Sequence, residues 1–268
     1  MIDFDAVNQG FSREAEFYDA DDEKNPVNRW ARSLVRKTAT RYIPSGGSIL
    51  EINAGTGADA FWLVEHGYRV HATDIADGML AAIGRKIELS KHGDRFTVQK
   101  LSLTNLEETD HAPFDGVFSN FGGLNCIPDL SAVVQGVKKV LKPGGWLVWV
   151  FMPPVCPWEL FQLFRGRARV AARRLKRGGA QANVRGVPIM TYYFTAKQVS
   201  KALGQDFEIA SLQSLSLLCP PMSMLGFINK FPRLTRSLMR LDEKAGKFPL
   251  LNQCGDLLVI AAHYLPKP

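Results

Sequence analysis

Between residues 48 and 57 the sequence places an acidic residue and two glycines in a pattern that suits ligand binding. A short apolar run that contains Glu51 leads directly into Asn53-Ala54-Gly55-Thr56-Gly57. Glycines at such a turn allow positive φ and let a ligand approach the backbone, beside the free N–H groups of the following helix. The turn predicts either a ligand site or a tight strand-to-helix connection without a ligand.

A second carboxylate, Asp74, ends the next predicted strand and is followed by Ile75. A carboxylate at the end of a second strand can accept hydrogen bonds from both hydroxyls of a ribose, and such ligands bind in the crevice beyond the strand ends. An alternative role for Asp74 is to cap the N-terminus of the following helix.

The elements that must position these residues alternate between strand and helix. Polar helices are predicted for residues 1 to about 45, before a Pro-Ser-Gly-Gly turn. Apolar and periodic runs then predict strands at 48–52, 69–73, 96–99, 114–119, 145–152, 207–217 and 255–264, and helices at 58–66, 78–89, 130–141 and 196–203. This alternation implies a parallel sheet with right-handed crossovers. Two insertions, 153–191 and 219–253, interrupt it and suggest a specificity cap.

Composition and cysteine placement exclude several classes of protein. The chain has 268 residues, 46% of them hydrophobic and 22% charged, which suits a globular protein with a large core. No apolar run is long enough to span a membrane, and the acidic N-terminus is unlike a secretory signal, so we expect a cytoplasmic protein. Cys126, Cys156, Cys219 and Cys254 are far apart, which predicts buried thiols and no metal site.

The net charge of +7 comes from one segment, because residues 165–185 hold eight basic residues and no acidic one. The spacing of the apolar residues within 158–177 predicts a single amphipathic helix with one apolar face. Its apolar face could cover a pocket while a basic face meets solvent, or the charge could attract an anionic acceptor or an acidic membrane surface. Nucleic acid is a weaker reading, because the arginines are not interleaved with stacking aromatic residues.

Four motifs together resemble a known family, the class I S-adenosylmethionine-dependent methyltransferases, and within it the small-molecule branch with ubiquinone-biosynthesis-type enzymes. The motifs are Glu51 to Gly57, Ala72-Thr73-Asp74-Ile75 with Gly78-Met79-Leu80, Phe114 to Ser119, and Val140-Leu141-Lys142-Pro143-Gly144-Gly145. The resemblance covers about residues 10 to 152. It implies S-adenosylmethionine as cofactor and in-line methyl transfer to a small-molecule or lipid-like acceptor, at O or C.

The resemblance also implies roles for single residues. Glu51 resembles the acidic residue that orients the methionine part of the cofactor, Asp74 the ribose ligand and Ile75 the apolar neighbour of adenine. The cofactor-binding residues implied are Glu51, Asn53, Ala54, Gly55, Gly57, Asp74, Ile75, Met79, Ser102, Leu103, Asn120 and Phe121.

The sequence departs from the family at three places. Asn53 stands where the family has its first glycine, although Asn tolerates left-handed backbone. Ser102 and Leu103 replace an Asp and a small residue, so a backbone contact to adenine from Leu103 is the simpler expectation. Phe121 is followed by Gly122 instead of two prolines after Asn120, which argues against methylation of adenine amino groups.

Methyl transfer chiefly requires alignment of the nucleophile and exclusion of water, with proton removal when the nucleophile is weak. Candidate catalytic residues are Asn120, which follows the fourth strand, Tyr18, in a segment that with Phe11 resembles a lid over the cofactor, and His111 as a base. Tyr18 could instead pack in the core. The other histidines, His66, His71, His92 and His263, are interpreted as structural. Five aromatic residues are predicted to line or cover an apolar acceptor pocket: Trp158, Phe161, Tyr192, Tyr193 and Phe227.

The predicted fold is therefore α/β: a Rossmann-like three-layer sandwich with a mostly parallel seven-stranded sheet, an antiparallel last strand and helical cap insertions. One domain, 1–268, would comprise an N-terminal helical lid (1–45), a cofactor-binding core (46–152) and two caps (153–191 and 219–253). Three alternatives stay open: a nicotinamide dehydrogenase, since Gly55 to Ala60 fits G-x-G-x-x-A, a nucleic-acid (RNA) methyltransferase, and a non-catalytic cofactor-binding partner protein.

Overall fold

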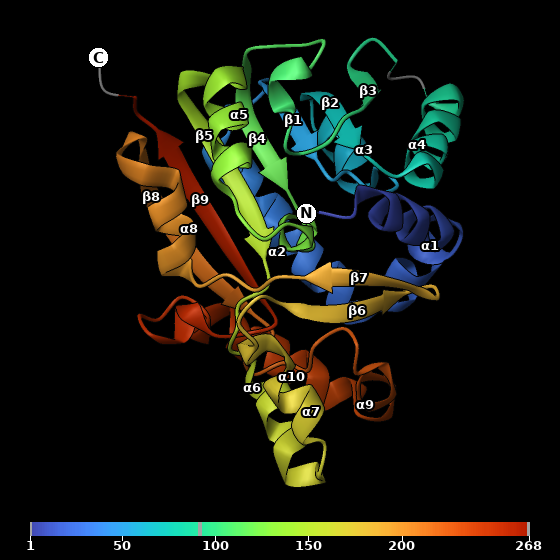
Figure 1. Cartoon of the computed structure of the whole chain (residues 1–268), viewed down its shortest axis with the longest axis vertical. Helices are drawn as coiled ribbons and strands as arrows, with labels where there is room; N and C mark the ends of the chain where they lie inside the picture. Colours follow the sequence, from blue (N-terminus) through green and yellow to red (C-terminus); the bar gives the residue numbers. More distant parts are fainter. Residues whose placement is uncertain (1, 91–92, 267–268) are drawn as a thin grey trace.

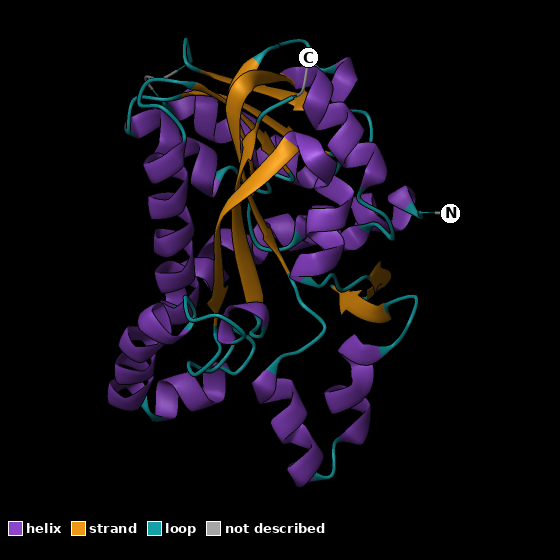
Figure 2. Cartoon of the chain, turned by 90° about the vertical axis from the view of Figure 1, so that its left-hand side faces the viewer, coloured by secondary structure: helices purple, strands orange, loops and turns teal. Residues whose placement is uncertain are grey.

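A seven-stranded sheet with helices on both faces forms the centre of the molecule in the computed structural model, which describes residues 2–90 and 93–266 (Figures 1 and 2). The strand order is β3-β2-β1-β4-β5-β9-β8. The elements up to β5 are α1 (Phe4–Lys24), α2 (Pro26–Tyr42), β1 (Ser48–Ile52), α3 (Ala58–Glu65), β2 (Arg69–Asp74), α4 (Asp77–Leu89), β3 (Phe96–Lys100), β4 (Phe114–Ser119), α5 (Ser131–Val140) and β5 (Leu141–Phe151). The later ones are α6 (Pro157–Leu160), α7 (Ala168–Ala172), β6 (Ala180–Val184), β7 (Val187–Thr191), α8 (Ala196–Leu203), β8 (Phe207–Leu215), α9 (Leu225–Lys230), α10 (Pro232–Ala245) and β9 (Leu257–Tyr264).

The direction of the strands confirms the predicted fold class. β1 to β5 pair in parallel, whereas β9, the last strand of the chain, runs antiparallel to both β5 and β8. The direction in which successive strands are added reverses between β1 and β4: β2 and β3 follow β1 on one side, and β5 follows β4 on the other. A crevice beyond the C-terminal ends of strands at such a reversal is where sheets of this kind hold ligands.

Side chains alternate along β5 between two separate cores, one on each face of the sheet. Leu147 and Trp149 join the cluster that contains Val133 and Val137 of α5. Val148 joins the opposite cluster, with residues of α2 and α3. This is the period of two that a strand buried on both faces requires. Both faces of the central strands are therefore fixed by packing, which makes the strand ends a rigid base for a site.

The two N-terminal helices follow the sequence prediction, and α1 lies across the ends of the strands. Asn25 ends α1 and caps α2, since its side chain accepts from the N–H groups of Val27 and Asn28. Gly78, at the start of α4, lets α1 approach closely: a Cβ there would lie 2.5 Å from the carbonyl oxygen of Ser12. The Ser12 hydroxyl accepts from the Gly78 N–H at 2.9 Å.

The first cap differs from the prediction, because residues 158–177 do not form one helix. α6 passes into a 3-10 turn, Phe161–Arg165, and Gly166 then adopts a left-handed φ of 71°, which ends the helix before α7 begins. The hairpin of β6 and β7 was not predicted at all. Its turn residues, Arg185 and Gly186, both have positive φ, as two-residue hairpin turns require.

The second cap is helical, as expected, with α9 and α10 between β8 and β9. Asp242 of α10 is buried and accepts from the N–H groups of Leu218 and Cys219, at 2.8 and 2.7 Å. Asn25 donates to the carbonyl oxygen of Met222, so the helical N-terminus and this cap are joined. None of the helices within residues 2–90 and 93–266 has the length and apolar character needed to cross a membrane.

Candidate functional site

A cavity of about 490 Å³ lies beyond the C-terminal ends of β1, β2 and β4. α1 and the β6–β7 hairpin form its outer wall. Of the residues implied by the sequence, those that line it are Tyr18, Asn53, Gly55, Asp74, Ile75, Met79, Ser102, Leu103, Asn120 and Phe121. Segments that are far apart in the sequence thus meet at the edge of the sheet where a ligand is expected.

The turn after β1 has the left-handed backbone that its glycines suggested. Asn53, Gly55 and Gly57 have φ values of 56°, 58° and 78°. The Ala54 N–H donates to the carbonyl oxygen of Thr73 at 3.0 Å, which fastens the turn to β2. Asn53 fits because a glycine faces it: a Cβ at Gly123 would lie 2.5 Å from the Asn53 Cβ. Asn53, which stands where the family has its first glycine, therefore has room for its side chain because Gly123 has none.

Asp74 fixes this turn and remains at the cavity wall. One carboxylate oxygen accepts from the Gly55 N–H and the other from the Ala76 N–H, both at 2.9 Å. Burial raises the pKa of Asp74, although the backbone donors oppose the shift. The N-cap of α4 is Ala76, so the capping role considered for Asp74 is not the one it has.

Glu51 lies beneath the turn and is almost fully buried, and it does not line the cavity. Its Oε2 has no hydrogen-bond partner among the described residues, and the same holds for Nδ2 of Asn53. Burial and the nearby charge of Asp59 raise the pKa of Glu51 well above its usual range. Buried polar atoms without a partner call for an explanation, and two of them on residues of the turn region are consistent with a polar ligand at this place.

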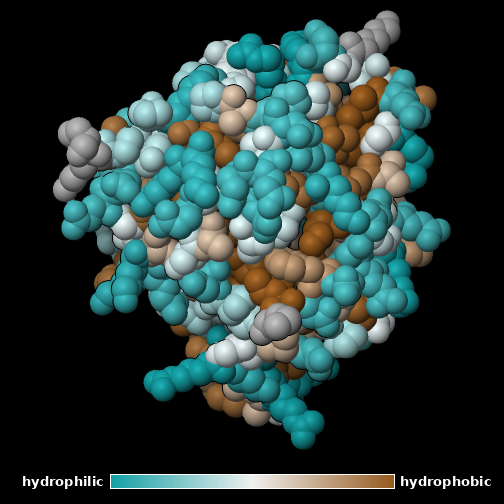
Figure 3. Space-filling view, turned by 45° about the horizontal axis from the view of Figure 1, so that its top comes forward, coloured by the Kyte–Doolittle hydropathy of each residue, from teal (hydrophilic) through white to brown (hydrophobic). Residues whose placement is uncertain are grey.

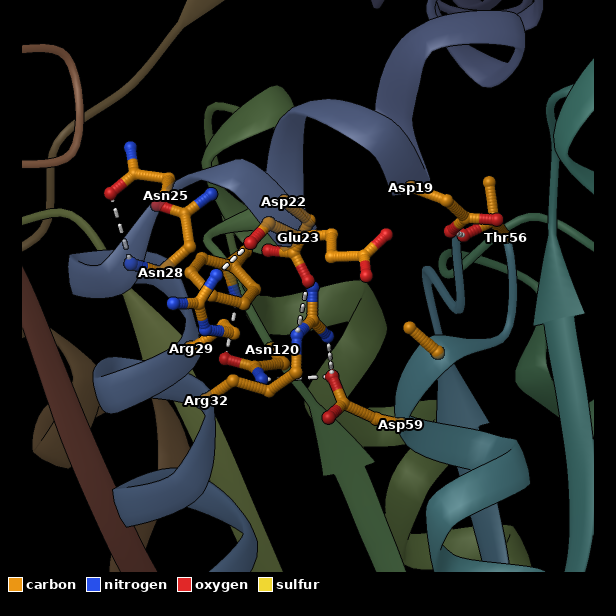
Figure 4. A network of polar contacts seen from close by, with 12 residues as sticks. Asp19, Asp22, Glu23, Asn25, Asn28, Arg29, Arg32, Thr56, Asp59 and Asn120 are labelled. Carbon is orange, nitrogen blue, oxygen red and sulfur yellow. Dashed lines mark hydrogen bonds and ion pairs between the residues drawn. The ribbon is translucent and has the colours of Figure 1, made fainter. Parts of the chain in front are cut away.

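A network of charged residues, which the sequence did not indicate, supports the cavity from α2 and α3 (Figure 4). Arg32 binds Asp59 and donates to Asp22 at 3.1 Å, while Arg36 donates to Asp59 at 2.7 Å. Burial alone would lower the pKa of Arg32. The charges of Asp59 and its neighbours together outweigh this effect, so the pKa of Arg32 is raised. The only sequence signal was the spacing of Arg32 and Arg36, four residues apart on one side of a helix.

The network also holds the loop after β4. Asn120 donates through Nδ2 to Asp59 at 2.9 Å, and its Oδ1 accepts from the Phe121 N–H at 2.8 Å. Phe121 has a φ of 52°, and its ring lies 4.5 Å from the guanidinium of Arg32. The side chain of Asn120 is therefore occupied with holding Phe121 in a strained conformation beside the cavity.

Tyr18 of α1 reaches the cavity next to this network. Burial raises the pKa of Tyr18, and the positive charge of Arg32 only partly offsets this increase. The hydroxyl group stays protonated near neutral pH, so it can donate a hydrogen bond but is a poor base.

His111 is exposed and precedes β4, at the end of the strand opposite to the cavity, where its ring meets that of His71 edge-on at 4.7 Å. His71 binds Thr97 and Gln99, and His263 stacks on Trp146. His66 donates through Nδ1 to the Trp62 carbonyl oxygen at 2.7 Å, and His92 lies outside the described residues. The structure does not bring His111 to the cavity.

The predicted aromatic lining is wrong: Trp158, Phe161, Tyr192, Tyr193 and Phe227 are all missing from the cavity wall. Trp158 and Phe227 pack on each other, with ring centroids 5.6 Å apart, and Phe161 is exposed because the helix that would have turned it inward is broken. Aliphatic and sulfur-containing residues line this side instead: Val7, Cys126, Met152, Ala182, Val184, Ile189, Met222 and Leu257.

Two of the basic residues expected on a solvated face are part of the cavity wall. Arg174 is 4% exposed and donates to Glu159 at 2.8 Å and to Asp256 at 2.5 Å. Arg173 binds Glu159 through two hydrogen bonds, at 2.7 and 2.5 Å. Both charges are therefore neutralised where they meet the cavity.

The thiols are only partly as predicted. Cys156 and Cys219 are buried, whereas Cys126 and Cys254 are partly exposed. Cys126 lines the cavity, where burial and the charge of Asp74 raise its pKa to about 12, so the thiol is neutral.

Comparison with known proteins adds to this geometry. A family model described as a methyltransferase domain matches residues 49–145. The demethylmenaquinone methyltransferase of Symbiobacterium thermophilum is 29% identical over 143 residues, 52% of this chain and 56% of that protein. The S-adenosyl-L-methionine-dependent Diels-Alderase of Talaromyces variabilis is 34% identical over 124 residues, 45% of this chain and 41% of that protein. The chain spans about half the length of these curated relatives.

A solved structure resembles almost the whole chain. The 1,6-didemethyltoxoflavin-N1-methyltransferase of Burkholderia thailandensis, with 1,6-didemethyltoxoflavin and S-adenosylhomocysteine bound, matches with a TM-score of 0.60 and 16% identity. The match covers 99% of this chain and 91% of that one. At this identity the likeness establishes a shared fold.

Proposed function

Since residues 49–145 belong to the methyltransferase-domain family, we propose that the protein binds S-adenosylmethionine in the cavity and transfers its methyl group to a small-molecule acceptor. The observation that carries the proposal is the meeting of three features at one edge of the sheet: the left-handed turn after β1, the carboxylate of Asp74 and the unpaired polar atoms of Glu51 and Asn53.

The donor set fits the proposed cofactor. Asp74 offers carboxylate lone pairs to ribose hydroxyls, and Ile75 and Met79 offer an apolar surface to a purine ring. Ser102 and Leu103 lie at the same end of the cavity, where backbone groups could meet the amino group of the base. Glu51 and Asn53 would bind polar groups of the methionine part, which would give both their missing partners.

When bound, this cofactor supplies an electrophilic methyl group on a positively charged sulfur. Four acidic residues besides Asp74 line the cavity, Glu14, Asp21, Asp22 and Asp256, and each of them forms an ion pair with an arginine. Among the described residues, Asp74 is therefore the lining carboxylate that no cation neutralises.

The chain's own residues would position the acceptor rather than activate it strongly. Asn120, held by Asp59, fixes Phe121 and Gly122 at the cavity floor, and Tyr18 can donate a hydrogen bond to an acceptor oxygen. α1 and the β6–β7 hairpin exclude water. Alignment of this kind can contribute about 7 to 11 kcal/mol to a group transfer.

The acceptor is proposed to be apolar over much of its surface. The wall away from the proposed cofactor site is aliphatic, with Val184, Ile189 and Leu257 among its residues. An anionic acceptor is less suited to this cavity, because the cations that line it within the described residues, Arg173 and Arg174, are neutralised by Glu159 and Asp256. Selectivity among acceptors would then come mainly from the shape of the cavity.

The remaining basic residues of 158–177 are proposed to serve a contact outside the cavity, on the cytoplasmic face of a membrane. Arg165, Arg167 and Arg169 are exposed and do not line the cavity. A cytoplasmic location is part of this proposal, and microscopy of the tagged full-length protein would test it.

Incubation with methyl-labelled S-adenosylmethionine and fractionated cell extract tests the proposed function. Label should move into a small-molecule fraction, and far less with Asp74→Asn. Label in RNA would favour the nucleic-acid alternative. Binding of the cofactor without transfer to any fraction would favour the non-catalytic alternative and contradict the proposal.

A further inference from the structure

We propose that the two caps together form a docking face for an anionic lipid bilayer, and that the second cap contributes as much of it as the basic segment of the first. The inference deepens the proposed function, because residues of both caps line the cavity, but its evidence is independent of the cofactor site. We call residues 157–177 and 225–251 the cap end.

The cap end projects from the body of the molecule. α6, α7, α9 and α10 gather at the lower end of Figure 1, away from the C-terminus, and Figure 2 keeps these helices at the same end after a quarter turn. The rings of Trp158 and Phe227 join the two segments, with centroids 5.6 Å apart. Both segments therefore meet through this ring pair and are presented to solvent at the same end of the molecule.

Large apolar side chains are exposed on both parts of the cap end. Phe164 is 84% exposed and Leu250 79%, the highest values among the apolar residues of the two segments. The exposed apolar residues are Leu160, Phe161, Leu163, Phe164, Val170, Leu175, Leu225, Phe231, Leu234, Leu241, Phe248, Leu250 and Leu251. A monomer that stays in water rarely exposes so many apolar side chains at one end, so this surface is expected to meet a partner.

Unpaired cations surround these apolar residues. The exposed basic residues are Arg165, Arg167, Arg169, Lys176, Arg177, Lys230, Arg233, Arg236, Arg240, Lys244 and Lys247. None of them forms an ion pair within the part of the chain that the structure describes. At the lower edge of Figure 3, hydrophilic side chains project on both sides of a hydrophobic patch.

The acidic residues of the cap end are all occupied elsewhere. Glu159 binds Arg173 and Arg174, Asp242 accepts from two backbone N–H groups, and Glu243 accepts from the indole N–H of Trp30 at 2.9 Å. The exposed charge at this end is consequently of one sign, which matches a surface of negative charge.

α10 shows how the apolar and basic groups are combined. Thr235, Asp242 and part of Leu238 face the core, whereas Leu234 and Leu241, seven residues apart and so about 20° apart around the helix, are exposed. Arg233, Arg236 and Arg240 extend around the solvent side. Interfacial helices combine apolar residues that enter the acyl region with basic residues that meet the headgroups in this way.

A lipid surface fits better than the other partners. A second copy of the chain joined through the same face would oppose two sets of unpaired cations, since a two-fold interface pairs a patch with itself. Nucleic acid could use the cations and stack on the four exposed phenylalanines, but it would leave the eight exposed leucines and the valine without a partner, because these cannot stack on bases. An anionic bilayer uses both.

Docking through the cap end would also place the cavity at the bilayer. Met222 and Ser223, which lead into α9, line the cavity, and so do Arg173 and Arg174, which follow α7. An apolar acceptor dissolved in the membrane could then reach the cavity without crossing water.

The test is flotation of the full-length protein with vesicles of phosphatidylcholine and phosphatidylglycerol, against phosphatidylcholine alone, at low and high salt. Each Lys or Arg that faces an anionic surface strengthens binding about fivefold, so loss of four should weaken partitioning by about a hundredfold or more. Arg233→Gln, Arg236→Gln, Arg240→Gln and Lys244→Gln in one variant remove charge from the second cap alone. Lys37→Gln, Arg69→Gln, Lys197→Gln and Lys201→Gln, all exposed outside the cap end, form the matched control.

The expected result is salt-sensitive binding to the anionic vesicles only, lost with the second-cap variant and kept within about twofold by the control. Phe164→Ser with Leu163→Ser should weaken binding without changing its salt dependence. Equal binding by the control and the second-cap variant would overturn the proposal, as would failure of the parent protein to float, or a preference for RNA or for self-association. Cofactor titration of the same samples separates this outcome from failure of the proposed function, because none of these residues lines the cavity.

Discussion

The core, residues 46–152, and the two caps bury their residues in different ways. In the core, apolar side chains of β5 alternate between two hydrophobic clusters, and the helices add apolar stripes of helical spacing. In the first cap, apolar side chains such as Phe164 are exposed while Arg174 is buried. The core is therefore held by a local pattern, whereas the cap depends on pairs such as Arg174 and Asp256, which are 82 positions apart.

The largest expected effect comes from removing the central cation of the first cap. Arg174→Met leaves Asp256 buried without its cationic partner and Glu159 with Arg173 alone, and breaking a buried pair in this way costs about 3 to 5 kcal/mol. Denaturant unfolding measures the loss. Arg169→Met, at an exposed and unpaired site nearby, is the control and should change the free energy of unfolding by less than about 0.5 kcal/mol. Similar values for the two variants would mean that the cap is not held by this ion pair.

The second cap contains a buried carboxyl group whose ionisation should oppose folding. Burial raises the pKa of Asp242 to about 6, although Cys219 and Leu218 donate to it. Below the unfolded-state pKa both states are protonated. As the pH rises to about 6 the unfolded chain ionises first, so stability decreases over this interval, by about 3 kcal/mol in total.

Asp242→Asn should remove this decrease. The substitution itself changes the free energy of unfolding by an amount that does not depend on pH. Unfolding experiments from pH 4 to 7 should therefore show that the stability of the parent falls relative to that of the variant as the pH rises. Asp5→Asn, on the exposed side of α1, serves as the control. A constant difference across the pH range would contradict the raised pKa.

In the core, the buried carboxyl group of Asp74 is proposed to bind the cofactor. Asp74→Ala should weaken cofactor binding by about 1 to 3 kcal/mol, the usual cost of removing a buried hydrogen-bonding group. Asp74 also accepts from the Gly55 N–H, so Asp74→Asn, which keeps an acceptor oxygen, should bind better than Asp74→Ala. Calorimetric titration compares both with Asp129→Ala, an exposed site. Unchanged affinity in all three would remove Asp74 from the site.

The smallest effect is expected where the cap exposes its apolar residues. Phe164→Ser should change the free energy of unfolding by less than about 0.5 kcal/mol. Phe118→Ala, in the core, should cost about 3 to 5 kcal/mol. A large loss from Phe164→Ser would show that this side chain has a packing partner in solution.

The same contrast explains what could be predicted from the sequence. The strands and helices of the core were predicted to within one residue at each end, except β5, which begins at Leu141 and not at residue 145; period and turn chemistry are local signals. The fold class was confirmed, and so was the family resemblance, by the match over residues 49–145. Residues 158–177 have a helical periodicity but form no single helix, since Gly166 interrupts it and Arg173 and Arg174 turn inward to distant carboxylates.

At the site, the motif residues could be predicted and their supports could not. The turn and Asp74 stand in contiguous motifs, whereas Arg32 and Asp59 reach the cavity from two helices and become significant only when these pack together. The aliphatic lining was missed for a similar reason, because the β6–β7 hairpin has an Arg-Gly turn in place of the Asn-Gly or Asp-Gly turn that would have marked it.

Titration of the purified protein with S-adenosylhomocysteine and, separately, with NADH tests the central claim most directly. Both ligands carry an adenosine unit, so the experiment distinguishes a methyltransferase site from a dinucleotide site on a similar turn. The account predicts saturable one-to-one binding of S-adenosylhomocysteine, weakened in Asp74→Ala, and no binding of NADH. Binding of NADH, or no binding of S-adenosylhomocysteine by a folded protein, would contradict it.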